Sequence, residues 1–293
     1  MKFGYFCNTT NWNHKPYDQL LNETQEITTF CDENNWDSIW YTEHHFNHEG
    51  MESCTNPLMM GVDAAARTKQ IRIGQACNVI TFHNPIRLAE DIALLDQLSG
   101  GRVDVGIGRG IYGREAINMN KEADLKDQAK NFRLFDESLT IMKKAWTEKF
   151  FSHKGEFYNY PTPGFNWQHD MSPPSEEFLD TKTNEIKKIS IVPKPKQQPH
   201  PPIWQVVDGA RSIEWAAQNG LNTIMWIPTV KALKGRFEIY RDAKSKAENR
   251  DVPLGEGVSL VRDMFIAETM EEAEKLAGEH IINYMKWVCH WRG

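Results

Sequence analysis

The sequence predicts an α/β protein built as a (β/α)8 barrel of the TIM type. Short β-rich runs alternate with helical patterns along most of the 293 residues, which indicates a parallel sheet. Right-handed crossovers turn such a series into a barrel or a doubly wound sheet, and seven predicted strands in a chain of this length favour the barrel. One insertion interrupts the series after the fourth helix, and we expect no eighth βα unit within residues 1–293, so that either the given stretch is truncated or the barrel closes in an unusual way. We expect one domain over residues 1–293.

The first strands and helices follow from hydrophobic periodicity. Lys2–Cys7 is β-rich, and Pro16–Asn34 carries apolar residues at helical spacing. Asp37–Tyr41 (DSIWY) predicts a second strand, and Pro57–Thr68 a second helix. Ile71–Ile80 (IRIGQACNVI) reads as one continuous third strand.

Helix-end signals mark the third helix. Asn84 can cap a helix that has Pro85 at its first position, and the run 99-SGG-101 ends it. Arg102–Ile107 is the predicted fourth strand, and Gln128–Thr147 the fourth helix.

Residues 148–201 break the alternation. Lys149–Tyr160 predicts a hairpin, and Glu185–Val192 a short strand inside a polar stretch. This stretch is rich in proline, since nine of the fourteen prolines lie between Pro161 and Pro202. The insertion is either a surface excursion or a lid over the carboxyl-terminal rim of the barrel.

The alternation then resumes. We expect strands at Pro202–Val207, Asn222–Ile227 and Val258–Ala267, with helices at Ala210–Asn219, at Val230–Asn249, and from Glu268 or Thr269 towards Trp291.

Composition excludes several classes of protein. The net charge is −6 with mixed signs, unlike the basic surface of a nucleic-acid binder. No apolar run has the length of a membrane span, and the N-terminus has no signal-peptide pattern. The five cysteines form no CxxC pair, which indicates a cytoplasmic protein with no structural disulfide.

The run 41-YTEHHF-46 places Glu43, His44 and His45 where the second strand ends. Three interpretations arise: a metal site, a satisfied polar patch, or an acid/base site. The chain has no HxH or HExxH pair, so we expect no metal. Because barrel enzymes place catalysis at the carboxyl ends of their strands, we favour an acid/base histidine.

The run 106-GIGRGIYG-113 contains a match to GxGxxG after the fourth strand. A dinucleotide-binding turn would lead at once into a helix, and we expect no helix before about Gln128. We therefore interpret the run as a loop where backbone approaches a ligand, with Arg109 offered to a phosphate or carboxylate.

A second anion-binding candidate is 205-QVVDGARSIEWAA-217. Asp208 and Gly209 turn the chain from a strand into a helix with Ser212 in its first turn. Free N–H groups there suit a phosphate. The alternative is simple capping of the helix by Asp208.

Four segments together resemble the bacterial-luciferase-like flavin monooxygenases. They are YTEHHF, IRIGQACNVI with HNPIRLAEDIALLDQLSGGR, VDVGIGRGIYG, and PHPPIWQVVDGARSIEWAAQNG. The resemblance implies a luciferase-like barrel with FMN at its mouth. In that family reduced FMN and O2 form a C4a-peroxyflavin, which oxygenates an organic substrate.

The resemblance also assigns roles to residues. His44 matches the family's acid/base, and the Ala76–Cys77 bond matches a flavin-facing peptide that is commonly cis. Arg109 matches the phosphate-binding arginine. The implied cofactor-binding set is Glu43, Ala76, Cys77, Gly108, Arg109, Gly110, Val207, Asp208, Gly209, Ser212 and Trp226. Phe6, His45 and Tyr112 are the implied substrate contacts.

The expected function is that of a two-component monooxygenase that uses reduced FMN from a separate flavin reductase. Its substrate would be a small apolar or cyclic organic compound with a carbonyl group, and its assembly a homodimer or heterodimer. Luciferase has a cysteine where this chain has Gly108, which argues against light emission. The alternatives are a deazaflavin-dependent dehydrogenase of the same superfamily and a non-catalytic flavin-binding protein.

Overall fold

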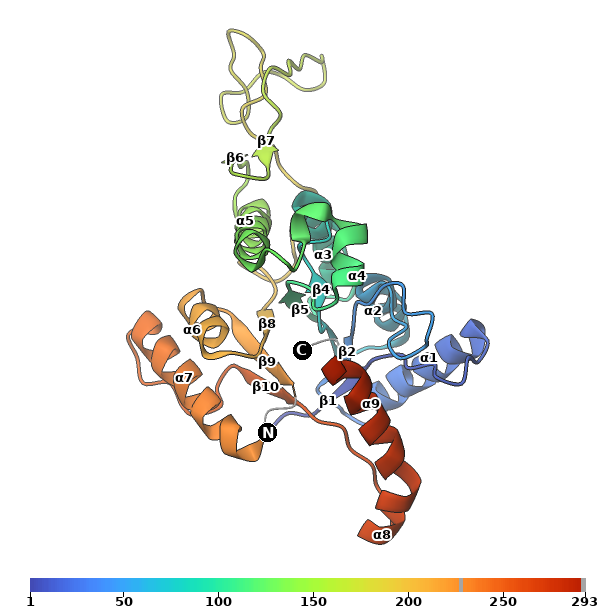
Figure 1. Ribbon diagram of the computed structural model, residues 1–293. Helices are drawn as coiled ribbons and strands as arrows, with labels where there is room; N and C mark the ends of the chain where they lie inside the picture. The colour runs from blue at the N-terminus through green and yellow to red at the C-terminus, as the bar shows by residue number, and fades with distance from the viewer. Residues whose placement is uncertain (227–228, 291–293) are drawn as a thin grey trace.

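A computed structural model describes residues 1–226 and 229–290 (Figure 1). The strands are β1 (Gly4–Cys7), β2 (Ser38–Tyr41), β3 (Arg72–Gln75), β4 (Asn78–Val79), β5 (Val103–Gly108), β6 (His153–Lys154), β7 (Asn159–Tyr160), β8 (Ile203–Val207), β9 (Asn222–Trp226) and β10 (Val258–Val261). The helices are α1 (Tyr17–Glu33), α2 (Pro57–Arg67), α3 (Pro85–Leu98), α4 (Gly113–Met119), α5 (Gln128–Thr147), α6 (Ala210–Gln218), α7 (Val230–Glu248), α8 (Met270–Ala273) and α9 (Glu279–His290).

The main sheet is parallel and nearly closed into a barrel. Its strands follow the order β1-β2-β3-β5-β8-β9-β10, and β4 adds to β5 beside β3. The helices surround this sheet in Figure 1. No pairing between β1 and β10 occurs among the described residues. The predicted barrel with seven of eight units is therefore confirmed.

Strand register decides which side chains point into the barrel. Partners in a parallel pair share a face, so the pairs Phe6↔Trp40, Trp40↔Gly74 and Ile224↔Val206 lie on the inside. Trp40 needs the space that Gly74 leaves, because a Cβ there would lie 2.1 Å from its ring. A large side chain on one strand therefore lies beside a glycine on the next strand in the interior of the barrel.

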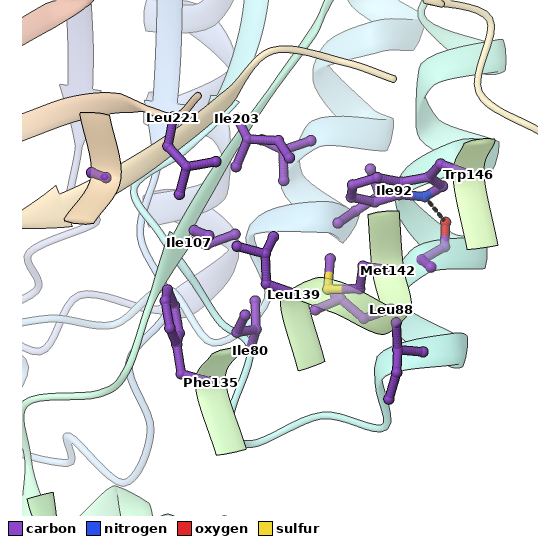
Figure 2. Close-up of a cluster of buried hydrophobic side chains, with 14 of the residues drawn as sticks. Ile80, Leu88, Ile92, Ile107, Phe135, Leu139, Met142, Trp146, Ile203 and Leu221 are labelled. Carbon is purple, nitrogen blue, oxygen red and sulfur yellow. Dashed lines mark hydrogen bonds between the residues drawn. The ribbon is translucent and has the colours of Figure 1, made fainter. Parts of the chain in front are cut away.

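The largest core cluster lies between the sheet and helices α3, α5 and α6 (Figure 2). Ile92, Ile107, Leu139 and Trp146 are almost fully buried in it. The Trp146 indole N–H donates to the carbonyl of Ala89 at 2.9 Å, so this large ring is buried without an unsatisfied polar atom. This packing holds the βα loops of the central strands in place.

Helix boundaries agree closely with the sequence prediction. Asn84 caps α3, its side chain accepting from the N–H groups of Ile86 and Arg87, with Pro85 at the first helical position. Two predictions were wrong. The expected strand Ile71–Ile80 is broken into β3 and β4 at a cis peptide bond between Ala76 and Cys77. A short helix, α4, also begins at Gly113, well before Gln128.

The insertion packs on the outside of the helical layer. The predicted hairpin is present as β6 and β7, but no strand forms over Glu185–Val192, where only isolated bridges occur. Tyr160 accepts from the Asn84 side chain beside α3, and the loop beyond the hairpin projects away from the barrel in Figure 1. No residue of 148–201 lines the main cavity described below, so the insertion is not a lid over it in this structure.

The last predicted strand is shorter than expected, whereas the last predicted helix is present and has Thr269 as its N-cap. The strand predicted over Val258–Ala267 ends at Val261, and the final helix is divided into α8, a turn of π-helix over Glu274–Gly278, and α9. The predicted end at Trp291 lies outside the described residues. α9 crosses the ends of β1 and β9, because its Tyr284 accepts from Asn8 at 2.9 Å and packs edge-on against Trp226.

No helix among residues 1–226 and 229–290 is long and apolar enough to cross a membrane.

Candidate active site

A cavity of about 600 Å³ opens at the carboxyl ends of the strands. Its lining includes most residues that the sequence singled out: Phe6, Glu43, His44, Ala76, Cys77, Gly108, Arg109, Gly110, Val207, Asp208, Gly209, Ser212 and Trp226. Segments separated by more than two hundred residues meet here because parallel strands bring their carboxyl ends to one rim.

One end of the cavity is cationic. Burial and the nearby charge of Arg211 both lower the pKa of Arg109. Arg109 forms no ion pair within the described part of the chain. Its guanidinium donates long hydrogen bonds to the carbonyl of Gln128 and the side chain of Asn131, and it lies over the Phe132 ring. An anion would relieve the repulsion between the two arginines.

The N-terminus of α6 faces the same end. Gly209 occupies the N-cap position, and no side chain caps the helix. The capping interpretation of Asp208 was therefore wrong, because this carboxylate pairs with Arg236 at 3.1 Å. The Ser212 hydroxyl donates to the carbonyl of Gly209 at 2.8 Å. The first amides of α6 remain available to an anion.

The middle of the cavity is shaped by close backbone approach. The cis bond at Ala76–Cys77 brings the Cys77 sulfur beside β5, and a Cβ on Gly108 would lie 2.3 Å from it. Gly110 has a φ of +82°, in the region that favours glycine. Together with Trp226 these residues border a space suited to a flat ring.

His44 lies at the opposite end, between two buried carboxylates. Its Nε2 atom is 3.6 Å from Glu52 Oε1, and its Nδ1 atom is 3.4 Å from Glu115 Oε1. Burial alone would lower the pKa of His44, but Glu52, Glu115 and Glu43 outweigh burial and raise it. The imidazole is therefore held towards its charged form.

Glu43 and His45 form a separate group beside this histidine. Glu43 Oε1 lies 3.0 Å from His45 Nε2 and 2.8 Å from His83 Nε2, and Glu43 Oε2 accepts from the Val79 N–H at 2.7 Å. Burial alone would raise the pKa of Glu43, but these hydrogen bonds and the charge of His83 lower it. Glu43 lines the large cavity and also a smaller one beside His83.

Of the three implied substrate contacts, one lines the cavity and two do not. Phe6 lines the cavity, whereas His45 and Tyr112 do not. Tyr112 is buried and donates to Glu52 Oε2 at 2.6 Å. No set of three His, Cys, Asp or Glu side chains suited to a metal occurs among the described residues.

Sequence reasoning missed Glu52, Glu115, Asn8 and Tyr284, all of which line the cavity. Glu52 and Glu115 occur in a loop and a short helix that no periodic pattern marks. Their only signal was position: each follows within ten residues of the EHH run or the glycine loop.

The fold and the cavity define a class of protein: a parallel βα barrel with a cavity at the carboxyl ends of its strands, lined by Arg109 and by a histidine that lies between two buried carboxylates. The family profile described as "Luciferase-like monooxygenase" matches residues 1–291. The chain therefore belongs to the luciferase-like monooxygenase family.

Two curated relatives illustrate the family. The chain is 29% identical over 291 residues to the oxygenase component of the flavin-dependent trigonelline monooxygenase of Acinetobacter baylyi. This match covers 97% of this chain and 70% of that protein. It is 28% identical over 245 residues to the alkanal monooxygenase alpha chain of Photorhabdus laumondii. That match covers 83% of this chain but only 58% of the relative.

Solved structures share the fold. The oxygenating constituent of 3,6-diketocamphane monooxygenase from Pseudomonas putida, solved with FMN, superposes with a TM-score of 0.78 at 23% identity, covering 97% of this chain and 73% of that one. A secondary alcohol dehydrogenase solved with a deazaflavin–acetone adduct gives a TM-score of 0.63 at 19% identity, with coverages of 85% and 65%. At these identities the likeness shows the fold alone.

Proposed function

We propose that this chain is the oxygenase component of a two-component, FMN-dependent monooxygenase. One observation carries the proposal: a single cavity joins Arg109 and the uncapped start of α6 to the carboxylate-flanked His44. Bound in reduced form, FMN would supply the electrons that activate O2.

The residues present fit the cofactor. Arg109 and the first amides of α6 would bind the phosphate, since they form a cationic end with no carboxylate paired to Arg109 among the described residues. The space bordered by Gly108, Cys77 and Trp226 would take the flat ring. His44 would hold or move a proton at the opposite end.

The substrate would be a small cyclic or apolar organic compound with a carbonyl group. The cavity lining includes the apolar side chains of Phe6, Val79, Ile224 and Val261. Such a wall binds a compact hydrophobic molecule and excludes water from the reacting atoms.

Two protein partners belong to this proposal. A separate flavin reductase would supply reduced FMN, which agrees with the printed name of the trigonelline relative as an oxygenase component. A second barrel chain, identical or different, would form a dimer, since the alkanal monooxygenase relatives are named as alpha and beta chains.

The experiment mixes the protein, loaded anaerobically with reduced FMN, with oxygenated buffer in a stopped-flow spectrophotometer. We expect the oxidised-flavin absorbance to return much more slowly than for free reduced FMN, because the cavity excludes water. His44→Ala should still bind FMN and lose product formation. Return as fast as in free solution would contradict the monooxygenase.

A matched pair of variants tests the phosphate end. Arg109→Ala should weaken FMN binding by roughly 10- to 100-fold, the loss of one charge-assisted contact of about 1.5–3 kcal/mol. Arg133→Ala is the control, because Arg133 is exposed and pairs with Glu156. Equal FMN affinity in both variants, measured by fluorescence quenching, would show that the phosphate binds elsewhere.

The second candidate function is that of a deazaflavin-dependent dehydrogenase. It is included because one solved structure with this fold is that of such an enzyme. It predicts preferential binding of the deazaflavin and no oxygen uptake. A third candidate, a flavin-binding protein without turnover, predicts that His44→Ala behaves like wild type.

A further inference from the structure

The His44 side chain lies between two acidic side chains that come from separate parts of the chain. Glu52 lies in the loop before α2, and Glu115 in the first turn of α4. They approach opposite ring nitrogens, and both carboxylates are almost completely buried, with 3% and 1% of their side chains exposed. His44 Nδ1 is itself buried and makes no hydrogen bond.

Both carboxylates are fixed by other donors. Glu52 Oε2 accepts from the Tyr112 hydroxyl at 2.6 Å, and Glu52 Oε1 accepts from the Tyr284 hydroxyl at 3.3 Å. Glu115 Oε1 accepts from the backbone N–H of His45 at 2.7 Å. Neither carboxylate can turn away without breaking a buried hydrogen bond, so the geometry around His44 is preorganised.

The charges in this cluster favour a cation at its centre. If the imidazole were neutral, it would not offset the negative charge of either buried carboxylate. An imidazolium offsets the charge of both, because it lies between them. The neighbouring cation Arg114 is already paired with Glu49. Among the described residues, the titratable and charged groups of this cluster are Glu43, Glu52, Cys77, Tyr112, Arg114, Glu115 and Tyr284.

We propose that Glu52 is a positioning residue that, together with Glu115, keeps His44 as an imidazolium, so that His44 enters the reaction as a proton donor. This inference rests on the proposed function for its role in turnover. The proton passes from Nε2 to a negatively charged oxygen of the molecule in the cavity. Neutral imidazole remains, and a proton from solvent restores the imidazolium before the next cycle.

The ionisation of His44 can be measured without flavin or substrate. Histidine-labelled protein is titrated by NMR, with the His44 signal among the ten histidines assigned from His44→Gln. In wild type we expect a midpoint above 6.5. In Glu52→Gln it should fall by about one pH unit or more, because an opposing charge is removed.

Two further variants separate this role from damage to the fold. Glu49→Gln changes an acid in the same loop that pairs with Arg114, so the His44 midpoint should stay at the wild-type value. Tyr112→Phe keeps the Glu52 charge but removes its 2.6 Å donor, and should move the midpoint less than Glu52→Gln. Circular dichroism confirms that each variant is folded.

The outcomes distinguish this inference from the proposed function. A wild-type midpoint at or below 6.5, or one unchanged in Glu52→Gln, overturns the inference whether or not flavin reacts with oxygen. If the midpoint shifts and FMN also binds, the high-pH limb of kcat should move to lower pH in Glu52→Gln. An unmoved limb would overturn the donor role of His44, and a failure to bind FMN would contradict the proposed function alone.

Discussion

At the scale of single residues, the acid–base groups form two neighbouring but distinct sets. Glu43 is bound by His45, His83 and the Val79 N–H, whereas His44 faces Glu52 and Glu115. Adjacent residues in the EHH run therefore take different partners. Glu43, which follows β2, accepts a hydrogen bond from Val79 in β4. This contact links the two segments beside His44.

The Glu43–His83 contact should make stability depend on pH. Burial alone would lower the pKa of His83, but Glu43 raises it above its ordinary value of 6.5. A raised folded-state pKa stabilises the protein below pH 6.5 and ceases to do so as pH rises through the folded-state value. The lowered pKa of Glu43 has the opposite effect on the pH dependence. Its contribution to the stability of the folded state is lost as pH falls below about 4.5.

We therefore expect His83→Ala to lower Tm most between about pH 5 and 6.5. The deficit should be up to about 1 kcal/mol after solvent screening, or about 2 °C, and should narrow above that range. Thermal melts followed by circular dichroism measure it. His48→Ala, at an 82% exposed side chain, is the control. A deficit that grows with pH would contradict the assignment.

At the scale of strands and helices, the site depends on how closely β3, β4 and β5 approach one another. The cis bond ends β3, and β5 presents Gly106 to the carbonyl of Gln75. A Cβ at Gly106 would lie 1.6 Å from that oxygen, which is backbone and cannot move as a side chain would. Glycine here permits the approach that brings Cys77 beside Gly108.

Gly106→Ala should consequently destabilise the chain by about 3 kcal/mol through a forced backbone shift. Gly113→Ala is the matched control, because a Cβ there meets nothing within 4 Å and alanine favours helix α4. Urea unfolding of both variants measures the difference. Equal midpoints for the two would mean that β3 and β5 are not held this tightly.

At the scale of the whole molecule, the described chain leaves apolar side chains uncovered on neighbouring helices. Met59 and Val62 on α2, and Leu94 and Leu98 on α3, are between 44% and 70% exposed. Helices α2 and α3 lie side by side. Under the dimer proposal, this surface is where a second chain would bind, since apolar side chains gain most from removal from water.

Replacing both leucines of this surface, as Leu94→Glu with Leu98→Glu, should shift a dimer to monomer by placing charges where apolar contact is expected. Sedimentation velocity over a range of concentrations measures the shift. Met171→Glu provides the control, because Met171 is 89% exposed in the insertion. A dimer that tolerates both leucine changes would move the interface elsewhere.

The alternation of strands and helices, the Asn84 cap and the two loop segments that line the cavity were predictable from sequence, because each depends on neighbours within a few residues. The break of the Ile71–Ile80 strand does not follow from the residue pattern, and only the family resemblance pointed to a cis bond at Ala76–Cys77. The extra helix α4 was also missed, because its seven residues are too short for a periodic pattern. The sequence located the insertion at residues 148–201 but left open whether it is a lid or a surface excursion, because that choice depends on contacts between residues far apart in the chain.

By itself the sequence determined the barrel class, the placement of His44 at the end of the second strand, and two separate candidates for an anion-binding segment, one at Arg109 and one at the 208–212 turn. Only the tertiary structure decided that Asp208 pairs with Arg236 rather than capping α6, and that Glu52 and Glu115 enclose His44. The physical reason is that pattern and propensity act over short sequence separations. Charge compensation acts through space, between residues that only the closed fold brings within a few ångströms of one another.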